Sequence, residues 1–459
     1  MSLIIPANSA AAATGFNVAN SCRFNDGSSD YLSRSNGTPT SLRKYTFSAW
    51  VKKTSTAGSL HTLYSNGTNG DNYMFIHFRQ DTEQLTYADI KSGQYQVNLR
   101  TNRVFRDSSA WYHVMIAVDT TQGTNTNRVK MYINGVQETS FHTATYPDQN
   151  DDLVLNGSNT NIGRYTIETD RYFDGYMSEV VFVDGTQQAN TDLGEFDEDS
   201  GIWKPIDVSG LTFGDNGYYL DFENSGALGA DVSGESNNFT VNNLTAIDQS
   251  TDTCTNNFCT INPLVNGTQR NPTLSEGNTF LTNTSGAWKN CLSSFAASSG
   301  KWYFEIKPTL HGTSYVHAGI FPVDDWQNQV SGYPNFGGTA NSWSYDSDGN
   351  IVNNDGNANT SPATYTTNDI IGIAVDLDNN KFYAYKNNAL QVAGGTSINA
   401  NIEYYFGGMG YNSNIAFNFG NPSYANTSDA ADGNGYGAFE FAPPSGYYAL
   451  NTKNLAEYG

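Results

Sequence analysis

The stretch Tyr45-Thr46-Phe47-Ser48-Ala49-Trp50-Val51 decides the fold class of this chain. Along it, apolar and other side chains alternate: Tyr45, Phe47, Ala49 and Val51 are separated by Thr46, Ser48 and Trp50. A period of two places successive side chains on opposite faces of a β-strand. The stretch therefore predicts a strand with one face in a protein core.

The same alternation recurs along the whole chain, while helical periodicity is nearly absent. It places four further sets of residues on shared strand faces: Val129, Met131 and Ile133; Met177, Val181 and Val183; Trp302, Phe304 and Ile306; and Ile371, Ile373, Val375 and Leu377. Pairs that suit the positive φ angles of tight hairpins occur at Asn134-Gly135, Asp174-Gly175, Asp184-Gly185 and Asp348-Gly349. With 44 glycines and many short strands, the chain is predicted to be all-β, built from antiparallel sandwiches.

A short internal repeat indicates that the architecture occurs twice. Ile116-Ala117-Val118-Asp119 is followed by a strand, an Asn134-Gly135 turn and a return strand. The same four residues recur at 373–376, again followed by a strand and an Asn387-Asn388 turn. Two related sandwiches are therefore expected.

Composition and charge exclude several classes of protein. The 459 residues include 45 acidic and 23 basic side chains, for a net charge of −22, which would repel a phosphate backbone, so no nucleic acid is expected as a partner. No apolar stretch is long enough for a membrane span. No basic residue precedes Arg23, so no signal peptide is expected, and four cysteines are too few for a disulfide scaffold.

Composition also divides the chain into four predicted parts. Residues 1–20 are small and polar and predict an N-terminal anchoring arm, residues 21–186 a first sandwich and residues 271–459 a second. Residues 187–270 are predicted to be an acidic connector that packs on the sandwiches. Thirteen Asp and Glu residues and a single basic residue, Lys204, fall between 187 and 259, so much of the negative charge lies there.

Four motifs in the first sandwich resemble the laminin-G-like (concanavalin-A-like lectin/glucanase) family. They are TFSAWV at 46–51, WYHV at 111–114, the hairpin at 131–135 and FDGYMSEV at 173–180. The resemblance implies a two-sheet jelly roll. Some relatives bind one calcium ion through carboxylate and carbonyl oxygens, so calcium is a candidate ligand, although no residues are assigned to it; no other cofactor is expected.

Four later motifs resemble a SPRY domain, which is also a jelly roll. They are GKWYFEI at 300–306, SYDSDGN at 344–350, DIIGIAVDLD at 369–378 and AFNFG at 416–420. The pairing of these two domains, with GIWKP at 201–205, NNFTVNNL at 237–244 and PPSGYYAL at 443–450, resembles bacteriophage virion proteins of the tail-fibre or head-appendage kind. The resemblances imply two tandem antiparallel jelly-roll β-sandwiches, concanavalin-A-like and SPRY-like, joined by the acidic connector.

Catalysis by a glucanase requires paired carboxylates about 5–5.5 Å or about 6.5–9.5 Å apart. The run from Glu195 to Ser200 approaches the E-x-D-x-x-E pattern of family glucanases, but its third carboxylate is replaced by Ser200. A solvated acidic loop is the favoured interpretation. The six histidines show no ligand spacing, and His113 is expected at the surface of a sheet. The chain is therefore predicted not to be an enzyme.

The run Asp346-Ser347-Asp348-Gly349-Asn350 superficially suggests a calcium loop. An EF-hand requires Gly at its sixth position and Glu at its twelfth, where this chain has Ile351 and Asn357. A hairpin turn through Asp348 and Gly349 is the favoured interpretation.

Carbohydrate binding requires aromatic faces to stack on sugars and polar groups to hydrogen-bond their hydroxyls. In the second sandwich, Trp326 and Tyr333, with Asp325 and Asn328 beside them, lie in loop-rich sequence and are the candidate ligand-binding residues. Trp343 and Tyr345 are expected in the core instead. In the first sandwich, one sheet face could hold Tyr73, His77, Tyr87 and Tyr95, although ordinary packing is favoured there.

The chain is thus predicted to be a structural and adhesion protein of a phage virion, assembled in the host cytoplasm. The arm would contact other virion proteins, and the lectin-like sandwiches would contact host cell-surface glycans. A homo-oligomer such as a trimer is expected by analogy with fibres. Two alternatives remain open: a purely architectural capsid decoration protein, and a polysaccharide depolymerase or glucanase.

Overall fold

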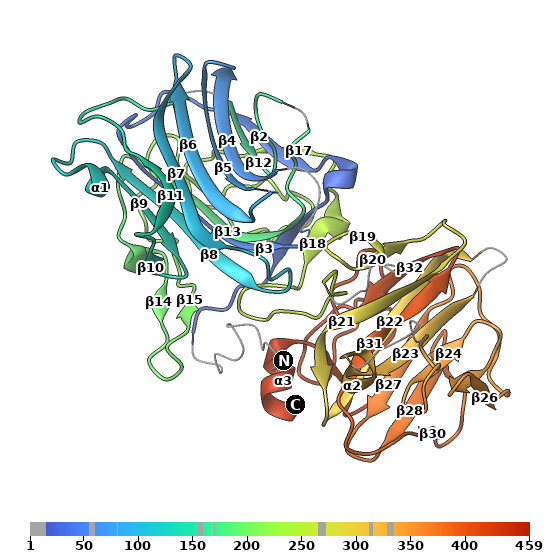
Figure 1. Ribbon diagram of the computed structural model, residues 1–459. Coiled ribbons are helices and arrows are strands. Elements are labelled where there is room, and N and C mark those ends of the chain that lie inside the picture. Colours follow the sequence, from blue (N-terminus) through green and yellow to red (C-terminus); the bar gives the residue numbers. More distant parts are fainter. Residues whose placement is uncertain are drawn as a thin grey trace. The chain divides into compact units, whose positions relative to one another are not determined.

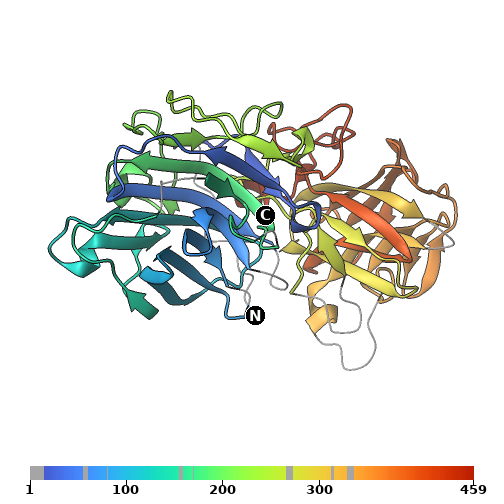
Figure 2. The same cartoon turned by 90° about the horizontal axis from the view of Figure 1, so that it is seen from above.

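The computed structural model describes residues 15–54, 60–79, 81–154, 159–168, 170–264, 272–311, 315–327 and 335–459. Two compact units divide the chain after Thr255. Each is a sandwich of two sheets of mainly antiparallel strands, seen as two layers in Figure 1 and, from above, in Figure 2. The predicted all-β fold of antiparallel sandwiches is confirmed. The helices are short: α1 (Asn125–Arg128), α2 (Val323–Gln327) and α3 (Thr452–Tyr458).

The first unit contains two sheets, named here after β3 and β5. In spatial order, the β3 sheet contains β10 (Val136–Gln137), β9 (Val129–Ile133), β8 (Trp111–Asp119), β3 (Lys44–Lys53), β13 (Gly175–Asp184), β1 (Ser21–Phe24) and β18 (Gln249–Ser250), with β16 (Tyr218–Leu220) also paired to β13. The β5 sheet contains β11 (Phe141–Thr145), β7 (Gln94–Val104), β6 (Gln84–Lys91), β5 (Asn72–Phe78), β4 (His61–Asn69), β12 (Asn159–Ile162), β2 (Tyr31–Ser35) and β17 (Thr240–Asn242). Their facing side chains, among them Phe47, Val51, Ile76 and Leu99, form one core.

The second unit likewise contains two sheets, named after β22 and β23. The β22 sheet contains β19 (Thr273–Ser275), β20 (Phe280–Thr282), β32 (Ser413–Asn418), β22 (Lys301–His311), β27 (Ile371–Asp376), β28 (Lys381–Lys386) and β29 (Ala389–Leu390), with β30 (Thr396–Ser397) beside β28 and β33 (Tyr448–Ala449) parallel to β22. The β23 sheet contains β21 (Trp288–Ala297), β31 (Tyr404–Tyr411), β23 (Val316–Pro322), β24 (Trp343–Asp346), β25 (Ile351–Asn353) and β26 (Gly356–Asn359). Trp302, Phe304 and Ile373 lie in their shared core.

The strand orders of the two units correspond. The path β10-β9-β8-β3-β13-β1-β18 has its counterpart in β29-β28-β27-β22-β32-β20-β19, and β7-β6-β5-β4-β12-β2 in β26-β25-β24-β23-β31-β21. The repeated four-residue motif falls at equivalent ends of β8 and β27, where its Asp forms a matching ion pair. Lys44 Nζ lies 3.6 Å from Asp119, and Lys301 Nζ lies 2.9 Å from Asp376. The prediction of two related sandwiches is confirmed.

The predicted glycine pairs have two different roles. Asn134-Gly135, with φ angles of 48° and 73°, turns the chain between β9 and β10, and Gly349, with φ of 88°, lies in the turn between β24 and β25. Asp174-Gly175 and Asp184-Gly185 instead lie at the two ends of β13. The prediction of tight hairpins there is wrong, because β13 pairs with β3 and β1 rather than with its sequence neighbours.

A β-bulge changes the faces of β13. Glu179 has a φ of 50°, and the register with β3 shifts between Ser178 and Val181. Met177 therefore points into the main core, whereas Val181 and Val183 pack on the opposite face. The prediction that these three residues share a face is wrong, since one inserted residue exchanges the faces beyond it.

The outer face of the β3 sheet is covered by chain that follows β13. The hairpin of β14 (Glu195–Phe196) and β15 (Trp203–Lys204) places the Trp203 ring against Gly135, where an added Cβ would lie 2.2 Å from a ring carbon. The same ring covers His113, which is only 1% exposed. The expectation that His113 lies at a sheet surface is wrong, because a distant segment covers that face.

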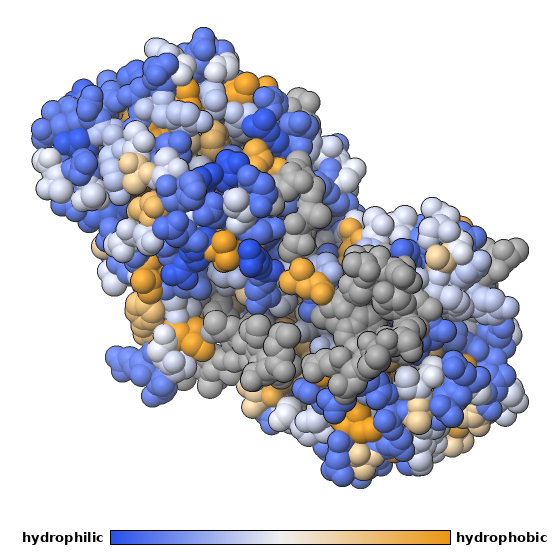
Figure 3. Space-filling view, viewed as in Figure 1, coloured by the Kyte–Doolittle hydropathy of each residue, from blue (hydrophilic) through white to orange (hydrophobic). Residues whose placement is uncertain are grey.

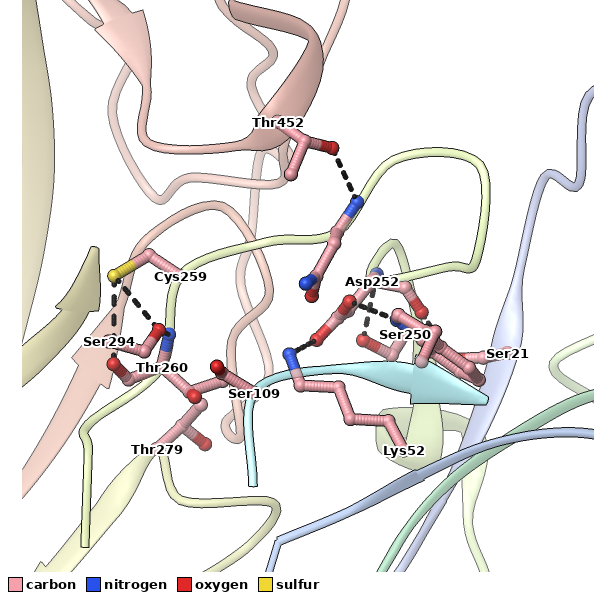
Figure 4. A network of polar contacts seen from close by, with 12 residues as sticks. Ser21, Lys52, Ser109, Ser250, Asp252, Cys259, Thr260, Thr279, Ser294 and Thr452 are labelled. Atoms are coloured by element: carbon pink, nitrogen blue, oxygen red, sulfur yellow. Dashed lines mark hydrogen bonds and ion pairs between the residues drawn. The ribbon is translucent and has the colours of Figure 1, made fainter. Parts of the chain in front are cut away.

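A buried ion pair fixes the end of the first unit to its sheet (Figure 4). Lys52 Nζ lies 2.7 Å from Asp252 Oδ2, and neither side chain is exposed. The Trp111 indole N–H donates to Asp252 Oδ1, and the Ser21 hydroxyl donates to the Asp252 carbonyl. These bonds hold residues 249–255 beside β1 and β3. Of the predicted arm, residues 1–14 lie outside the described residues, while Val18 is buried and packs with Trp50 and Trp111.

The surface is mostly polar. On the face drawn in Figure 3, hydrophilic colours dominate both units and hydrophobic residues form small separate patches. All four cysteines are buried, and none of them forms a disulfide. Among the described residues, no helix is long and apolar enough to cross a membrane.

Candidate functional site

The four predicted ligand-binding residues follow β23. Asn328 and Tyr333 lie outside the described residues, as does the side chain of Trp326, whose backbone belongs to α2. Asp325 accepts a 2.5 Å hydrogen bond from the Thr339 hydroxyl, so one of its carboxylate oxygens ties α2 to the chain before β24. A binding role for these four residues stays a prediction. Trp343 and Tyr345 lie in the core, as expected.

The near-match to a glucanase motif lies in the β14–β15 hairpin. Asp197 accepts hydrogen bonds from the Ser200 N–H and hydroxyl and from Lys204 Nζ. The Ser200 donors, followed by Lys204, lower the pKa of Asp197 to about 2. This carboxylate therefore stays ionised and stabilises an exposed turn by accepting hydrogen bonds. A general acid must carry a proton to donate, so Asp197 is not suited to that role.

The run that begins at Asp346 is a hairpin turn, as expected. Asp346 accepts hydrogen bonds from the Asn350 N–H and side-chain amide, and the Gly349 N–H donates to the Asp346 carbonyl. Both carboxylate oxygens are used within the turn. Across the part of the chain that the structure describes, no group of three or more His, Cys, Asp or Glu side chains gathers as a metal site.

One serine–histidine pair lies beneath the Trp203 ring. His113 Nε2 lies 2.7 Å from Ser48 Oγ, and the Trp203 indole N–H donates to His113 Nδ1 over 3.1 Å. Because an indole nitrogen only donates, Nδ1 is the acceptor and Nε2 carries the hydrogen. An imidazole that donates to serine cannot take the serine proton, so this pair is not an activated nucleophile.

An aromatic ladder runs along the outer face of β5. Tyr73, Phe75 and His77 stack in succession, with ring centroids 6.2 Å and 4.3 Å apart. Tyr165, from the segment after β12, meets both Tyr73 and Phe75 edge-on at 5.8 Å. The Ser65 hydroxyl holds that segment against β4 through the Arg164 carbonyl. The ladder therefore combines one strand with chain almost a hundred residues away.

A row of unpartnered polar side chains crosses the sheet beside this ladder. Thr62 on β4, His77 on β5 and Thr86 on β6 are neighbours in the strand register. They are 0%, 3% and 4% exposed. Nevertheless, no hydrogen-bond partner in the described structure reaches either hydroxyl or either ring nitrogen of His77. Buried polar groups are normally paired with protein, ordered water or ligand, so the row is a set of unsatisfied hydrogen-bonding groups just beneath the outer surface of the sheet.

The charges around the row are balanced. Arg171 lies 4.8 Å above the Tyr165 ring and forms an ion pair of 2.5 Å with Glu168. Arg79 forms two hydrogen bonds with Asp81. Burial, followed by the nearby Arg79 and Arg171, lowers the pKa of His77 to about 3, so its ring is neutral at ordinary pH. The site thus offers neutral donors and acceptors beside aromatic rings.

Sequence reasoning identified this face only in part. Tyr73 and His77 share it, but Tyr87 points into the core, where its hydroxyl lies 2.8 Å from that of Tyr45. Tyr95 on β7 is 54% exposed and takes no part in the ladder. Phe75 could have been added from its spacing between Tyr73 and His77. Tyr165 could not, because its contact depends on how a remote loop folds back.

The chain carries two domains of known type. Residues 26–190 match the family model of the concanavalin A-like lectin/glucanases superfamily (laminin G type), and residues 301–422 match the model of the SPRY domain. The chain therefore has a laminin G-type, concanavalin A-like domain followed by a SPRY domain, and both resemblances stated above are confirmed. No curated protein sequence matches the chain.

Several solved structures are similar to parts of the chain. A Bacteroides ovatus protein to which carbohydrate binding has been ascribed is 20% identical, with a TM-score of 0.34 over 50% of this chain; the chain spans only 59% of that protein's length. The LG4-5 domains of the mouse laminin alpha1 chain are 12% identical over 87% of this chain and 85% of theirs, with a TM-score of 0.30. The SPRY domain of human HERC1 is 17% identical over 30% of this chain and 87% of its own, with a TM-score of 0.25.

Proposed function

We propose that this chain is a non-enzymatic carbohydrate-binding protein, and that the outer face of the β5 sheet receives the saccharide. The observation that carries the proposal is the row of Thr62, His77 and Thr86, whose polar atoms lack partners beside an aromatic ladder. Sugars present hydroxyls and apolar C–H faces together, and the row and the ladder hold the two complements. Their members Thr62, His77, Thr86, Phe75 and Tyr165 are at most 8% exposed, so the proposal requires this face to open when a saccharide binds.

The proposed ligand is an uncharged glycan. Arg79 and Arg171 are already paired with acidic side chains, and His77 is neutral. An anionic sugar would therefore have to displace existing ion pairs, whereas a neutral sugar needs only the free hydroxyls and imidazole. Individual contacts of this kind are weak, so display in many copies would raise the total avidity.

The proposed setting is the surface of a phage particle, where the protein would attach to host cell-surface glycans as a homo-oligomer. The motifs at 201–205, 237–244 and 443–450 support this setting through their resemblance to virion proteins. Mass spectrometry of purified particles followed by cryo-EM would place the chain on the head or the tail. Its absence from purified particles would overturn the virion role and leave carbohydrate binding untouched.

Carbohydrate binding is tested with a glycan array and calorimetry on the full chain. Substitution of Thr62→Val together with Thr86→Val keeps side-chain shape and removes two hydroxyls, so affinity for a bound glycan is expected to fall at least tenfold. Stability should stay equal or rise by roughly 1 kcal/mol, because unpaired buried hydroxyls are lost. Tyr95→Ala, on the same sheet but outside the ladder, is the matched control and should bind normally.

Two results would contradict the proposal. The first is unchanged affinity in the double threonine variant, which would remove the row from the site. The second is the absence of any glycan binding by the wild-type chain at millimolar ligand, which would favour the purely architectural alternative.

A further inference from the structure

The second unit has an aromatic cluster of its own on the outer face of the β23 sheet. Trp288 at the start of β21 is surrounded by Tyr315, His317 and Tyr411, with ring centroids 6.0, 5.5 and 5.6 Å away. Tyr315 is 45% exposed, and Trp288 and Tyr411 are half-buried. The cluster is therefore open to solvent.

The cluster lies on the outer face of its sheet, as the first site does, but largely on strands that are not equivalent to β4, β5 and β6. β21, β31 and β23 hold the places in the second unit that β2, β12 and β4 hold in the first. In both units, a buried histidine on the outer face lies beside an aromatic ring: His77 stacks on Phe75, and His317 meets Trp288 edge-on. No residue of this cluster was selected from the sequence, because its members come from three strands that are far apart in the chain.

The hydrogen bonds of His317 fix which of its nitrogens is available. His317 Nδ1 lies 3.0 Å from Ser344 Oγ, and the Ser344 hydroxyl donates its only hydrogen to the Phe336 carbonyl over 3.1 Å. Ser344 can therefore only accept from His317, so Nδ1 carries the hydrogen and Nε2 has the lone pair. His317 is 9% exposed, and no described residue is a partner for its Nε2.

The charges near the cluster are already satisfied. Asp346 is the strand neighbour of His317, and both of its carboxylate oxygens accept hydrogen bonds from Asn350. Burial lowers the pKa of His317 to about 3, so the imidazole stays neutral. The cluster thus offers three aromatic rings, one neutral acceptor and no unpaired charge from these residues, which disfavours ionic ligands.

We infer that the Trp288 cluster is a second saccharide site, which binds one residue of a neutral glycan by stacking it on Trp288 and accepting a hydroxyl at His317 Nε2. An indole face with flanking phenols suits the apolar side of a pyranose, and the imidazole lone pair suits a hydroxyl on its edge. The inference extends the proposed carbohydrate binding to the second unit and rests on it for the class of ligand. Each unit would then carry one saccharide site.

The test uses the full chain with neutral hexose and N-acetylhexosamine oligosaccharides as probes, in calorimetry and saturation-transfer NMR. Wild type is expected to bind at two sites. Trp288→Ala should lose one of them, with at least a tenfold drop in its affinity. Tyr315→Ala is the second variant, because an exposed side chain outside β23 can be removed without loss of folding; a threefold or greater weakening of the same site is expected.

The outcomes separate this inference from the proposed function. If the Thr62→Val and Thr86→Val variant loses one site and Trp288→Ala loses the other, both the proposed site in the first unit and the second site at the Trp288 cluster are supported. If Trp288→Ala and Tyr315→Ala, each folded by circular dichroism, bind like wild type, the second site is refuted and the first is unaffected. If only the cluster variants lose binding, the first site is refuted instead. Phe196→Ala, an exposed aromatic in the β14–β15 hairpin, is the control and should change neither site.

Discussion

At the scale of single residues, the pair of Lys52 and Asp252 is a stability determinant of the first unit. Both side chains are fully buried, and their 2.7 Å contact joins β3 to residues near position 250. Burying two charges costs solvation energy, so such a pair need not stabilise more than apolar residues of the same size. Loss of one partner is different, because it leaves a charge without compensation.

Lys52→Met is expected to destabilise the first unit by about 3–5 kcal/mol, since the buried Asp252 side chain would lose its charged partner. Adding Asp252→Asn should restore part of this loss, because the amide oxygen can still accept from the Trp111 indole. Chemical denaturation of the three variants measures both effects. A loss below about 0.5 kcal/mol in the single variant would show that water reaches the pair.

At the scale of elements, the bulge in β13 places an acid where the sheet would otherwise bury an apolar side chain. Glu179 accepts a 2.6 Å hydrogen bond from the Tyr219 hydroxyl and lines a small cavity of about 10 Å³ with Ser48 and His113. Burial raises the pKa of Glu179 to about 8, and Asp221, Glu223 and Asp207 act in the same direction. The bulge therefore makes the stability of the contact between β13 and the chain that follows it dependent on pH, through Glu179.

The first unit should lose stability as pH rises from about 4.5 towards 8. In this range the unfolded chain releases the Glu179 proton while the folded chain keeps it, so the contribution is complete below the unfolded pKa and is lost through the folded one. Glu179→Gln, which can still accept from Tyr219, should flatten this slope. Thermal denaturation from pH 5 to 9 measures it, and equal slopes in wild type and variant would show that Glu179 is not responsible.

The strands also show how much of the fold could be predicted from the sequence. Strand alternation located β3, β9, β22 and β27 with their core faces, because one buried face leaves a period of two in the residue types. The same alternation failed at Met177, since a bulge adds one residue without any local signal. The prediction that His113 lies at a sheet surface was wrong because Trp203, ninety positions later, covers it. Of the ladder, the sequence named only Tyr73 and His77, within a face for which ordinary packing was favoured. Tyr165 and the Trp288 cluster were missed because chain segments far apart in sequence complete them.

At the scale of the whole molecule, the two units have separate cores. The residues of the first core end at Leu244, and those of the second begin at Cys259. Each core joins the two sheets of one sandwich. Two unfolding transitions are therefore expected, since multidomain chains do not follow a two-state scheme.

Phe304→Ala should lower only one of these transitions. The Phe304 ring is 1% exposed and stacks at 5.4 Å on Phe419, so its truncation is expected to cost about 3–5 kcal/mol, or roughly 6–20 °C. Phe47→Ala, in the first core, should lower the other transition and serves as the reciprocal control. Differential scanning calorimetry distinguishes the two. A single transition that both variants shift equally would contradict separate unfolding.

The corresponding strand orders also decide where the chain can be divided for expression. The edge position beside β1 is filled by β18, which comes from the end of the first sandwich, whereas the same position beside β20 is filled by β19, which precedes the second. A fragment that stops at residue 186 would lack β16, β17, β18 and the carboxylate that neutralises Lys52. A fragment that runs to Thr255 would keep them all, and its partner fragment must begin before Thr273 to keep β19. Because the second core begins at Cys259, the usable cut lies between Thr255 and Cys259, well beyond the end of the laminin G-type match at residue 190.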